Sequence, residues 1–171
     1  MDGDKNRRDE DNGIQFHIDQ KYGKGQTKLH KAAMDDNVDE CRNLLSRGAN
    51  INCTDKWRWS PLMAAAVKGY LPTCVLLTDS GANVHLTSND GNTALSLAAH
   101  KGCHDVVDHL IKQQANINTT DDDGESPLII PAREEHLQVC VLLTDSGADV
   151  HLADRYCNLR MRKEFTDLIF Y

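Results

Sequence analysis

The sequence has no hydrophobic run that approaches the roughly 20 apolar residues needed to span a membrane. Its start, Met1 to Arg8, is mostly polar and charged and lacks the apolar core of a secretory signal peptide. It also has no Gly-rich phosphate loop, no Gly-x-Ser-x-Gly nucleophile motif and no His-Glu-x-x-His metal motif. We therefore expect no membrane insertion, no secretion, no enzymatic activity, no cofactor and no small-molecule substrate. The cytoplasm is the expected location, with the nucleus as the alternative.

Positive charge is scarce in the middle of the chain. The net charge is −7, and the whole excess falls on residues 25–152, which carry 17 acidic and 10 basic side chains. An acidic surface of this size repels a phosphate backbone. We therefore do not expect nucleic acid as a partner.

Two short motifs return every 33 residues, which indicates a repeat protein. The first is Gly-Ala-Asn or a close variant: Gly48-Ala49-Asn50, Gly81-Ala82-Asn83, Gln114-Ala115-Asn116 and Gly147-Ala148-Asp149. The second begins with Thr or Ser and has Leu in third place: Thr27-Lys28-Leu29-His30, Ser60-Pro61-Leu62-Met63, Thr93-Ala94-Leu95-Ser96 and Ser126-Pro127-Leu128-Ile129.

This period and the Thr-Pro-Leu-His-like motif resemble the ankyrin repeat. The resemblance implies an all-α solenoid of stacked helix-turn-helix units with β-hairpin fingers. It also implies non-catalytic protein binding on the concave face, as a scaffold, adaptor or inhibitor; a purely structural spacer within a larger assembly is the alternative. The expected segments are a largely disordered arm at 1–24, four repeats at about 25–57, 58–90, 91–123 and 124–153, and a capping tail at 154–171.

Residue types predict where the helices of each repeat begin and end. A side-chain oxygen that can cap a first helix recurs in every repeat, and glycine is expected to end most second helices in a left-handed conformation. The capping residues are Thr27, Ser60, Thr93 and Ser126, and the terminating glycines are Gly48, Gly81 and Gly147.

The fourth repeat departs from this pattern at two positions. Pro131 stands inside its first helix, where it removes a hydrogen bond and crowds the preceding turn. Glu135 stands where Gly69 and Gly102 link the two helices of their repeats. We expect this repeat to be distorted and the weakest of the four. The tail from Leu159 to Tyr171 has apolar residues at helical spacing and is expected to cover it.

The six cysteines are expected to be reduced thiols. Cys41, Cys74 and Cys140 share one position of the repeat with Val107, which indicates a core position for a small apolar side chain. The cluster most like a metal site is not expected to converge, and solvated histidines near turns are the preferred interpretation. It consists of His100, Cys103, His104 and His109.

The resemblance implies that a partner contacts the fingertips and exposed first-helix positions. His30, within the capping motif, is instead expected to hydrogen-bond neighbouring turns. The expected partner-binding residues are Lys56, Trp57, Arg58, Trp59 and Lys68 in the second repeat, Asn89, Asp90, Asn92, His100 and Lys101 in the third, and Asp122, Asp123 and Glu125 in the fourth.

Two fingertips are unusual. Trp57-Arg58 stands where the later repeats have Asp90-Gly91 and Asp123-Gly124, which suit a tight turn better. Trp and Arg are enriched at binding hot spots. The alternative is that Trp57 or Trp59 folds back onto the array, but we expect at least one to be exposed.

The other unusual fingertip is acidic, at residues 121–125. It is either a solvated surface or one end of a charge gradient that orients a partner.

The resemblance also implies a modification, because some ankyrin hairpins are substrates of an asparaginyl hydroxylase. The matching positions here include Asn52, Asn118 and His151. Only Asp149 keeps the acidic residue two positions before the target, so hydrogen bonding within the hairpins is the alternative role.

Overall fold

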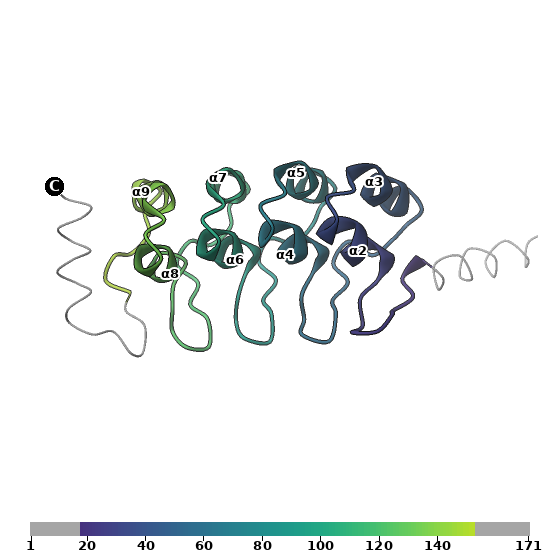
Figure 1. The fold of residues 1–171 in the computed structure, drawn as a ribbon, viewed down its shortest axis with the longest axis horizontal. Helices are drawn as coiled ribbons and strands as arrows, with labels where there is room; N and C mark the ends of the chain where they lie inside the picture. The colour runs from purple at the N-terminus through teal and green to yellow at the C-terminus, as the bar shows by residue number, and fades with distance from the viewer. Residues whose placement is uncertain (1–17, 153–171) are drawn as a thin grey trace, which may run out of the picture.

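The computed structural model describes residues 18–152, and its helices form two parallel rows (Figure 1). Each repeat contributes one helix to each row, and neighbouring helices of a row pack against one another. The predicted all-α solenoid is confirmed. The first row consists of α2 (Lys28–Met34), α4 (Pro61–Ala66), α6 (Ala94–His100) and α8 (Ile129–Arg133), and the second of α3 (Val38–Ser46), α5 (Leu71–Asp79), α7 (His104–Lys112) and α9 (Leu137–Asp145).

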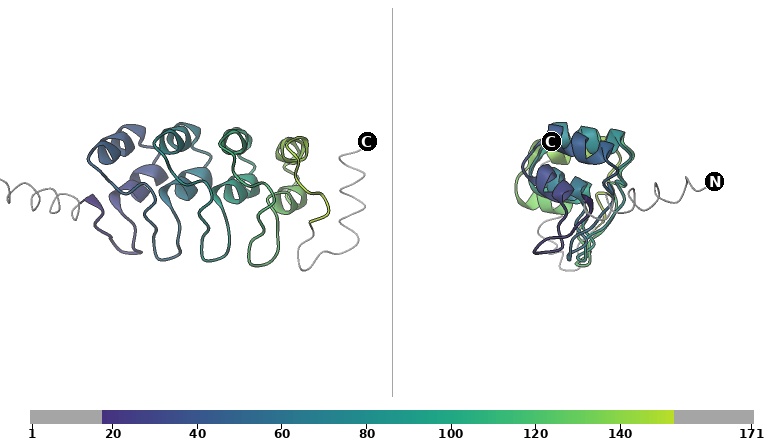
Figure 2. Two further views of the ribbon diagram at one scale, coloured as in Figure 1. Left: turned by 180° about the vertical axis from the view of Figure 1, so that it is seen from behind. Right: turned by 90° about the vertical axis from the view of Figure 1, so that its right-hand side faces the viewer.

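Four fingers extend beyond the first-helix row and point to the same side of the array (Figure 2). Each is a five-residue turn in which the first N–H donates to the last carbonyl, at N–O distances of 2.8 to 3.0 Å. Apart from one isolated bridge between Tyr22 and Gln26, the fingers within residues 18–152 contain no paired strands. The expected β-hairpins are therefore reduced to tight turns. The four fingers span residues 22–26, 55–59, 88–92 and 121–125.

The packed array begins earlier than expected. Ile18 is only 3% exposed and belongs to the core. The Asn50 N–H donates to Asp19 Oδ1 at 2.9 Å, and Lys21 Nζ donates to the Thr54 carbonyl at 2.9 Å. Ile18, Asp19 and Lys21, which were expected to belong to the arm, therefore pack against or bond to the array. The rest of the predicted arm lies outside the described residues.

Most predicted helix ends are confirmed. Ser60 Oγ accepts from the Met63 N–H, and Thr93 Oγ1 accepts from the Ser96 N–H, each at 3.2 Å. The second helices are followed by a left-handed residue in every repeat: Gly48, Gly81, Gln114 and Gly147 have φ of 85°, 92°, 63° and 92°.

One core runs through the array, and the repeated motifs supply it. The predicted Cys/Val position is confirmed as core, because Cys41, Cys74, Val107 and Cys140 are each at most 1% exposed. Burial raises the pKa of Cys41 and Cys140 to about 11 and that of Cys74 to about 12, so these thiols stay protonated. The described cysteines are all free thiols, and Cys157 lies outside the described residues.

The fourth repeat is distorted, as predicted, but its helix start was predicted wrongly. Ser126 does not cap α8: the Ile129 N–H donates to the Ser126 carbonyl at 3.0 Å, and the buried Ser126 Oγ has no partner. Pro131 explains the difference, because its ring crowds the turn before it and its nitrogen cannot donate. α8 therefore begins only at Ile129 and is the shortest of the described helices. Glu135 has a φ of 61°, which confirms the strained link.

Truncating the chain after Asp154 is expected to loosen residues 126–152. Leu137 and Val141 of α9 are 49% and 50% exposed, whereas their counterparts in α5, Leu71 and Val75, are partly buried because α7 packs against α5. The predicted capping tail lies outside the described residues, and we expect it to cover α8 and α9. Amide hydrogen exchange in this repeat should become at least about tenfold faster on truncation. Equal exchange in both chains would contradict the capping role.

Lowering the pH below about 6.5 is expected to destabilise the protein through His30. The buried His30 ring accepts from the Thr27 N–H at Nδ1 and contacts the Trp59 carbonyl at Nε2, at 3.2 and 2.8 Å. These contacts suit the neutral ring, and burial lowers its pKa. The unfolded chain therefore binds the proton more readily than the folded protein does. The contribution of neutral His30 to the free energy of unfolding is fully present above the unfolded pKa and falls as the pH drops towards the folded pKa.

Urea unfolding between about pH 5 and 8 measures this effect, whose slope is at most about 1.4 kcal/mol per pH unit. His30→Gln should flatten the dependence, whereas the exposed His85→Gln is the matched control and should not. An unchanged slope in His30→Gln would show that other groups cause the dependence.

Candidate binding surface

The fingertip of the second repeat is held from inside by a buried carboxylate. Asp55 is 7% exposed, and its Oδ1 accepts from the backbone N–H groups of Trp57 and Trp59, each at 2.9 Å. Between them, Arg58 has a φ of 61°, in the left-handed region that costs a residue with a Cβ about 1 kcal/mol. The other three fingers have glycine at this position. The expected strain in this turn is therefore present.

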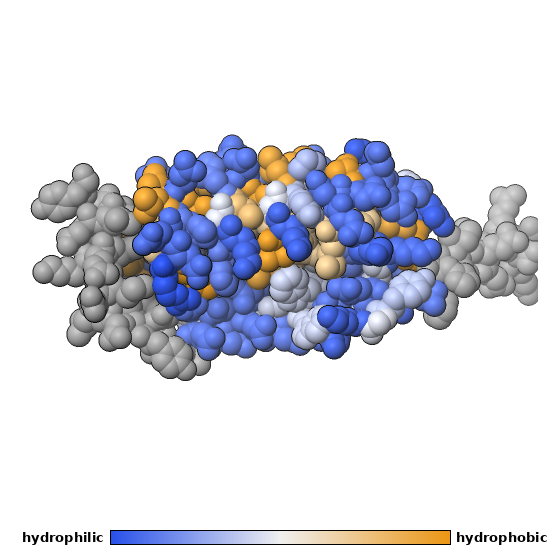
Figure 3. Space-filling model, viewed as in Figure 1, coloured by the Kyte–Doolittle hydropathy of each residue, from blue (hydrophilic) through white to orange (hydrophobic). Residues whose placement is uncertain are grey.

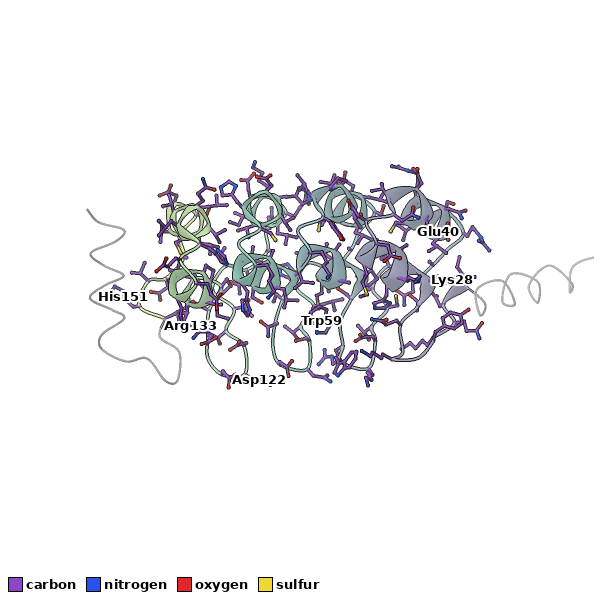
Figure 4. The ribbon with its side chains drawn as sticks, in the orientation of Figure 1. Lys28, Glu40, Trp59, Asp122, Arg133 and His151 are labelled. Carbon is purple, nitrogen blue, oxygen red and sulfur yellow. The ribbon has the colours of Figure 1, made fainter. Side chains whose placement is uncertain are left out.

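Trp57 is exposed at this fingertip, and Trp59 is not. The Trp57 side chain is 39% exposed, with Lys56 Nζ at 4.2 Å and Lys24 Nζ at 5.1 Å from the ring centre. Trp59 is partly buried, packs against the core and lies close to α4 (Figure 4). The expectation of at least one exposed tryptophan is confirmed. The alternative, folding back onto the array, applies to Trp59.

The fingertips are locked to one another by backbone hydrogen bonds. The Lys56, Asn89 and Asp122 N–H groups each donate to a carbonyl of the preceding finger, at 3.1, 2.9 and 3.0 Å. The fit between the third and fourth fingers leaves no room for a side chain at Gly91, where a Cβ would lie 2.9 Å from the Asp121 backbone. The tips therefore form one continuous edge, and Figure 3 shows mainly hydrophilic side chains along it.

The acidic fingertip divides into structural and exposed carboxylates. Asp121 Oδ1 accepts from the Asp123 and Glu125 N–H groups at 3.1 and 2.8 Å, as Asp55 does in its own finger. Burial is the largest influence on Asp121 and raises its pKa. Glu125 forms an ion pair with Arg133 at 2.6 Å. Asp122 and Asp123 are exposed, and Figure 4 shows Asp122 at the end of its finger.

The other predicted binding residues lie along the same side as the fingers and first helices. Asn89 and Asp90 occupy the third fingertip and are exposed, while Asn92 closes that finger and is partly buried. Lys68 and Lys101 are exposed just after α4 and α6, and His100 ends α6.

The histidines and cysteine near α7 do not form a metal site. His109 Nε2 lies 2.8 Å from Thr78 Oγ1 of the neighbouring repeat, and His104 Nδ1 lies 3.2 Å from Asp105. Residues 18–152 contain no group of three or more His, Cys, Asp or Glu side chains that could hold a metal ion.

Two of the possible hydroxylation targets link adjacent repeats. Asn52 Oδ1 accepts from the Asn83 N–H at 2.8 Å, and Asn118 Oδ1 accepts from the Asp149 N–H at 2.9 Å. The alternative role in hairpin hydrogen bonding is therefore present for both. The exposed His151 donates its backbone N–H to Asp149 Oδ1 at 2.8 Å. Hydroxylation at all three positions stays a prediction.

Sequence reasoning missed the first finger as part of this surface. Tyr22 is 49% exposed, and Lys24 lies over the Trp57 ring. The signal was available, because Tyr22 and Gln26 lie 33 residues before Asp55 and Trp59, the ends of the second finger.

Comparison with known proteins assigns the family. The family model for ankyrin repeats, in three copies, matches residues 7–88 and 69–154. The chain therefore belongs to the ankyrin repeat family, whose members are generally protein–protein interaction modules and typically non-catalytic. No curated protein matches the chain. Among the described helices, none has the length and apolar character needed to cross a membrane.

Proposed function

We propose that this protein is a non-catalytic binding module, a scaffold, adaptor or inhibitor, whose partner is a protein that lies across the fingertips and the first-helix row. The observation that carries the proposal is the second fingertip, where an exposed tryptophan sits beside an arginine in a strained backbone. Strain of this kind persists at functional sites when the surrounding structure enforces it. Large aromatic side chains and arginine dominate binding energy at protein interfaces.

The alternative is a spacer that only positions other chains. That function predicts that both tryptophans are buried, and the exposure of Trp57 argues against it. Cytoplasmic or nuclear location and the absence of nucleic-acid binding stay predictions.

Affinity capture with the full chain tests the proposal when it is repeated with Trp57→Ala. The matched control is Arg42→Ala, which truncates another large exposed side chain but on α3 in the second-helix row. The proposal predicts captured proteins that are retained by the control and lost from Trp57→Ala. Proteins retained equally by both variants would contradict binding at the fingertips.

Reversing two exposed charges on the fourth finger is expected to slow association. Asp122→Lys/Asp123→Lys leaves Asp121 in place, because its carboxylate holds the turn. Exposed charges act mainly on the association rate and are screened by salt, so a change of about tenfold at low salt should shrink at high salt. Asp79→Lys/Asp145→Lys makes the same charge change at the ends of α5 and α9. If both double variants change the association rate equally, or neither changes it, the acidic fingertip is only a solvated surface.

A further inference from the structure

The first two fingers carry a basic and aromatic cluster on an otherwise acidic array. We define the basic–aromatic edge as Tyr22, Lys24, Lys56, Trp57 and Arg58, all of which are exposed. Residues 25–152 carry the whole net charge of −7, so this edge is opposite in sign to the array taken as a whole. The acidic side chains in the two fingers and their bases, Asp19 and Asp55, both accept backbone N–H groups.

The cations of this edge have no acidic partner within the described structure. The ion pairs among residues 18–152 involve other groups and include none of Lys24, Lys56 and Arg58. Lys24 and Lys56 instead flank the Trp57 ring at 5.1 and 4.2 Å. Each ammonium group is attracted to the ring, while the two like charges repel each other. An anion bound beside both ammonium groups would offset this repulsion.

Arg58 adds a third cation at a strained position. With a φ of 61°, it occupies a backbone conformation that glycine adopts at the equivalent position of the other fingers. Within residues 18–152 the guanidinium group has no ion pair that would offset the strain. A planar guanidinium pairs well with a carboxylate, which it can bind through two parallel hydrogen bonds.

We propose that the basic–aromatic edge binds an acidic stretch of the partner protein, rich in Asp and Glu. This inference rests on the proposed function and adds the chemistry of the partner and its orientation. The third and fourth fingertips carry Asp90, Asp122 and Asp123, and the backbone bonds between fingers place them on the same edge. A partner segment that lies along this edge contacts the cations of the first two fingers at one end and the carboxylates of the last two at the other. We therefore expect Asp and Glu at the first end of the segment and Lys or Arg at the other. A nucleic acid, with negative charge along its whole length, would be repelled by the second half of the edge.

Selection from a displayed library of random peptides of about 12 residues tests this chemistry with the full chain as bait. The expected binders contain Asp and Glu at one end and Lys or Arg at the other. Lys24→Glu/Lys56→Glu should weaken the selected peptides by at least about tenfold at low salt. The matched control Arg42→Glu/Arg47→Glu makes the same charge change in and next to α3, on exposed residues, and should leave the affinity within about twofold.

The outcomes separate this inference from the proposed function. Peptides that lose affinity on Trp57→Ala but show no acidic preference would overturn the inference and leave the proposed function standing. Peptides whose affinity is unchanged by Trp57→Ala would overturn both the inference and the proposed function. If a single-stranded oligonucleotide binds the same edge more tightly than the peptides do, the proposal that the partner is a protein is wrong. Neutralising Asp9, Glu10 and Asp11 to their amides should leave the affinity unchanged; a tenfold or larger gain would identify the chain's own start as the occupant and overturn an external one.

Discussion

Replacing Trp57 by alanine is expected to weaken partner binding by at least about 2 kcal/mol, or about 30-fold, with little loss of stability. The side chain is 39% exposed at the end of a finger, and the backbone bonds that hold the turn come from Asp55 and do not need the indole. Its contribution should therefore appear in the dissociation rate of the complex. Titration calorimetry with a captured partner measures the affinity, and urea unfolding measures the stability.

Trp59→Ala supplies the contrast, because Trp59 is partly buried against the core. Truncating it should lower the free energy of unfolding by about 2 kcal/mol or more, since the lost apolar contact leaves a cavity beside α4. If Trp57→Ala destabilises the protein as much as Trp59→Ala while binding stays unchanged, then Trp57 is a packing residue and the proposed surface is wrong.

Replacing Pro131 by alanine is expected to stabilise the protein by about 1 to 3 kcal/mol. Alanine restores the N–H that can donate along α8 and removes the ring that crowds the first turn. The buried Ser126 Oγ, which has no partner now, can then accept from the Ile129 N–H as Ser60 Oγ accepts from Met63. The midpoint of urea unfolding and hydrogen exchange in residues 126–143 both measure the change.

Ser126→Ala is the matched control for this mechanism. In the native chain it removes an unpaired buried oxygen and should be neutral or slightly stabilising. In the Pro131→Ala background it removes a helix cap and should cost about 1 kcal/mol. Identical effects of Ser126→Ala in both backgrounds would show that the cap is not restored.

The repeated positions were predictable because each has the same physical role in every repeat. The 33-residue period identified the helices of both rows, the Cys/Val core position and the strained link at Glu135. The first finger escaped prediction because Tyr22 stands where the other fingers have a side-chain acceptor, although Gly25 keeps the left-handed glycine. Its place in the array comes instead from its neighbour, since Lys56 needs the Lys24 carbonyl as an acceptor.

The candidate surface was predictable in outline but not in the roles of its members. Asp121, Asp122 and Asp123 are the same residue type, so the sequence does not distinguish them. The Asp121 carboxylate turns inward to hold the finger, whereas Asp122 and Asp123 face solvent. The same inward role falls to Asp55 and to Ser88, whose Oγ accepts from the Asp90 and Asn92 N–H groups. Side-chain direction decides these roles, and it follows from the turn geometry, not from residue type alone.

Backbone amide chemical shifts of the full chain, recorded with and without a captured partner, test the binding surface most directly. We expect the largest changes at residues 56–59 and 89–92 and at the ends of α4 and α6, with small changes along α3, α5, α7 and α9. Changes concentrated on the second-helix row, with the fingertips unaffected, would contradict the proposed binding surface.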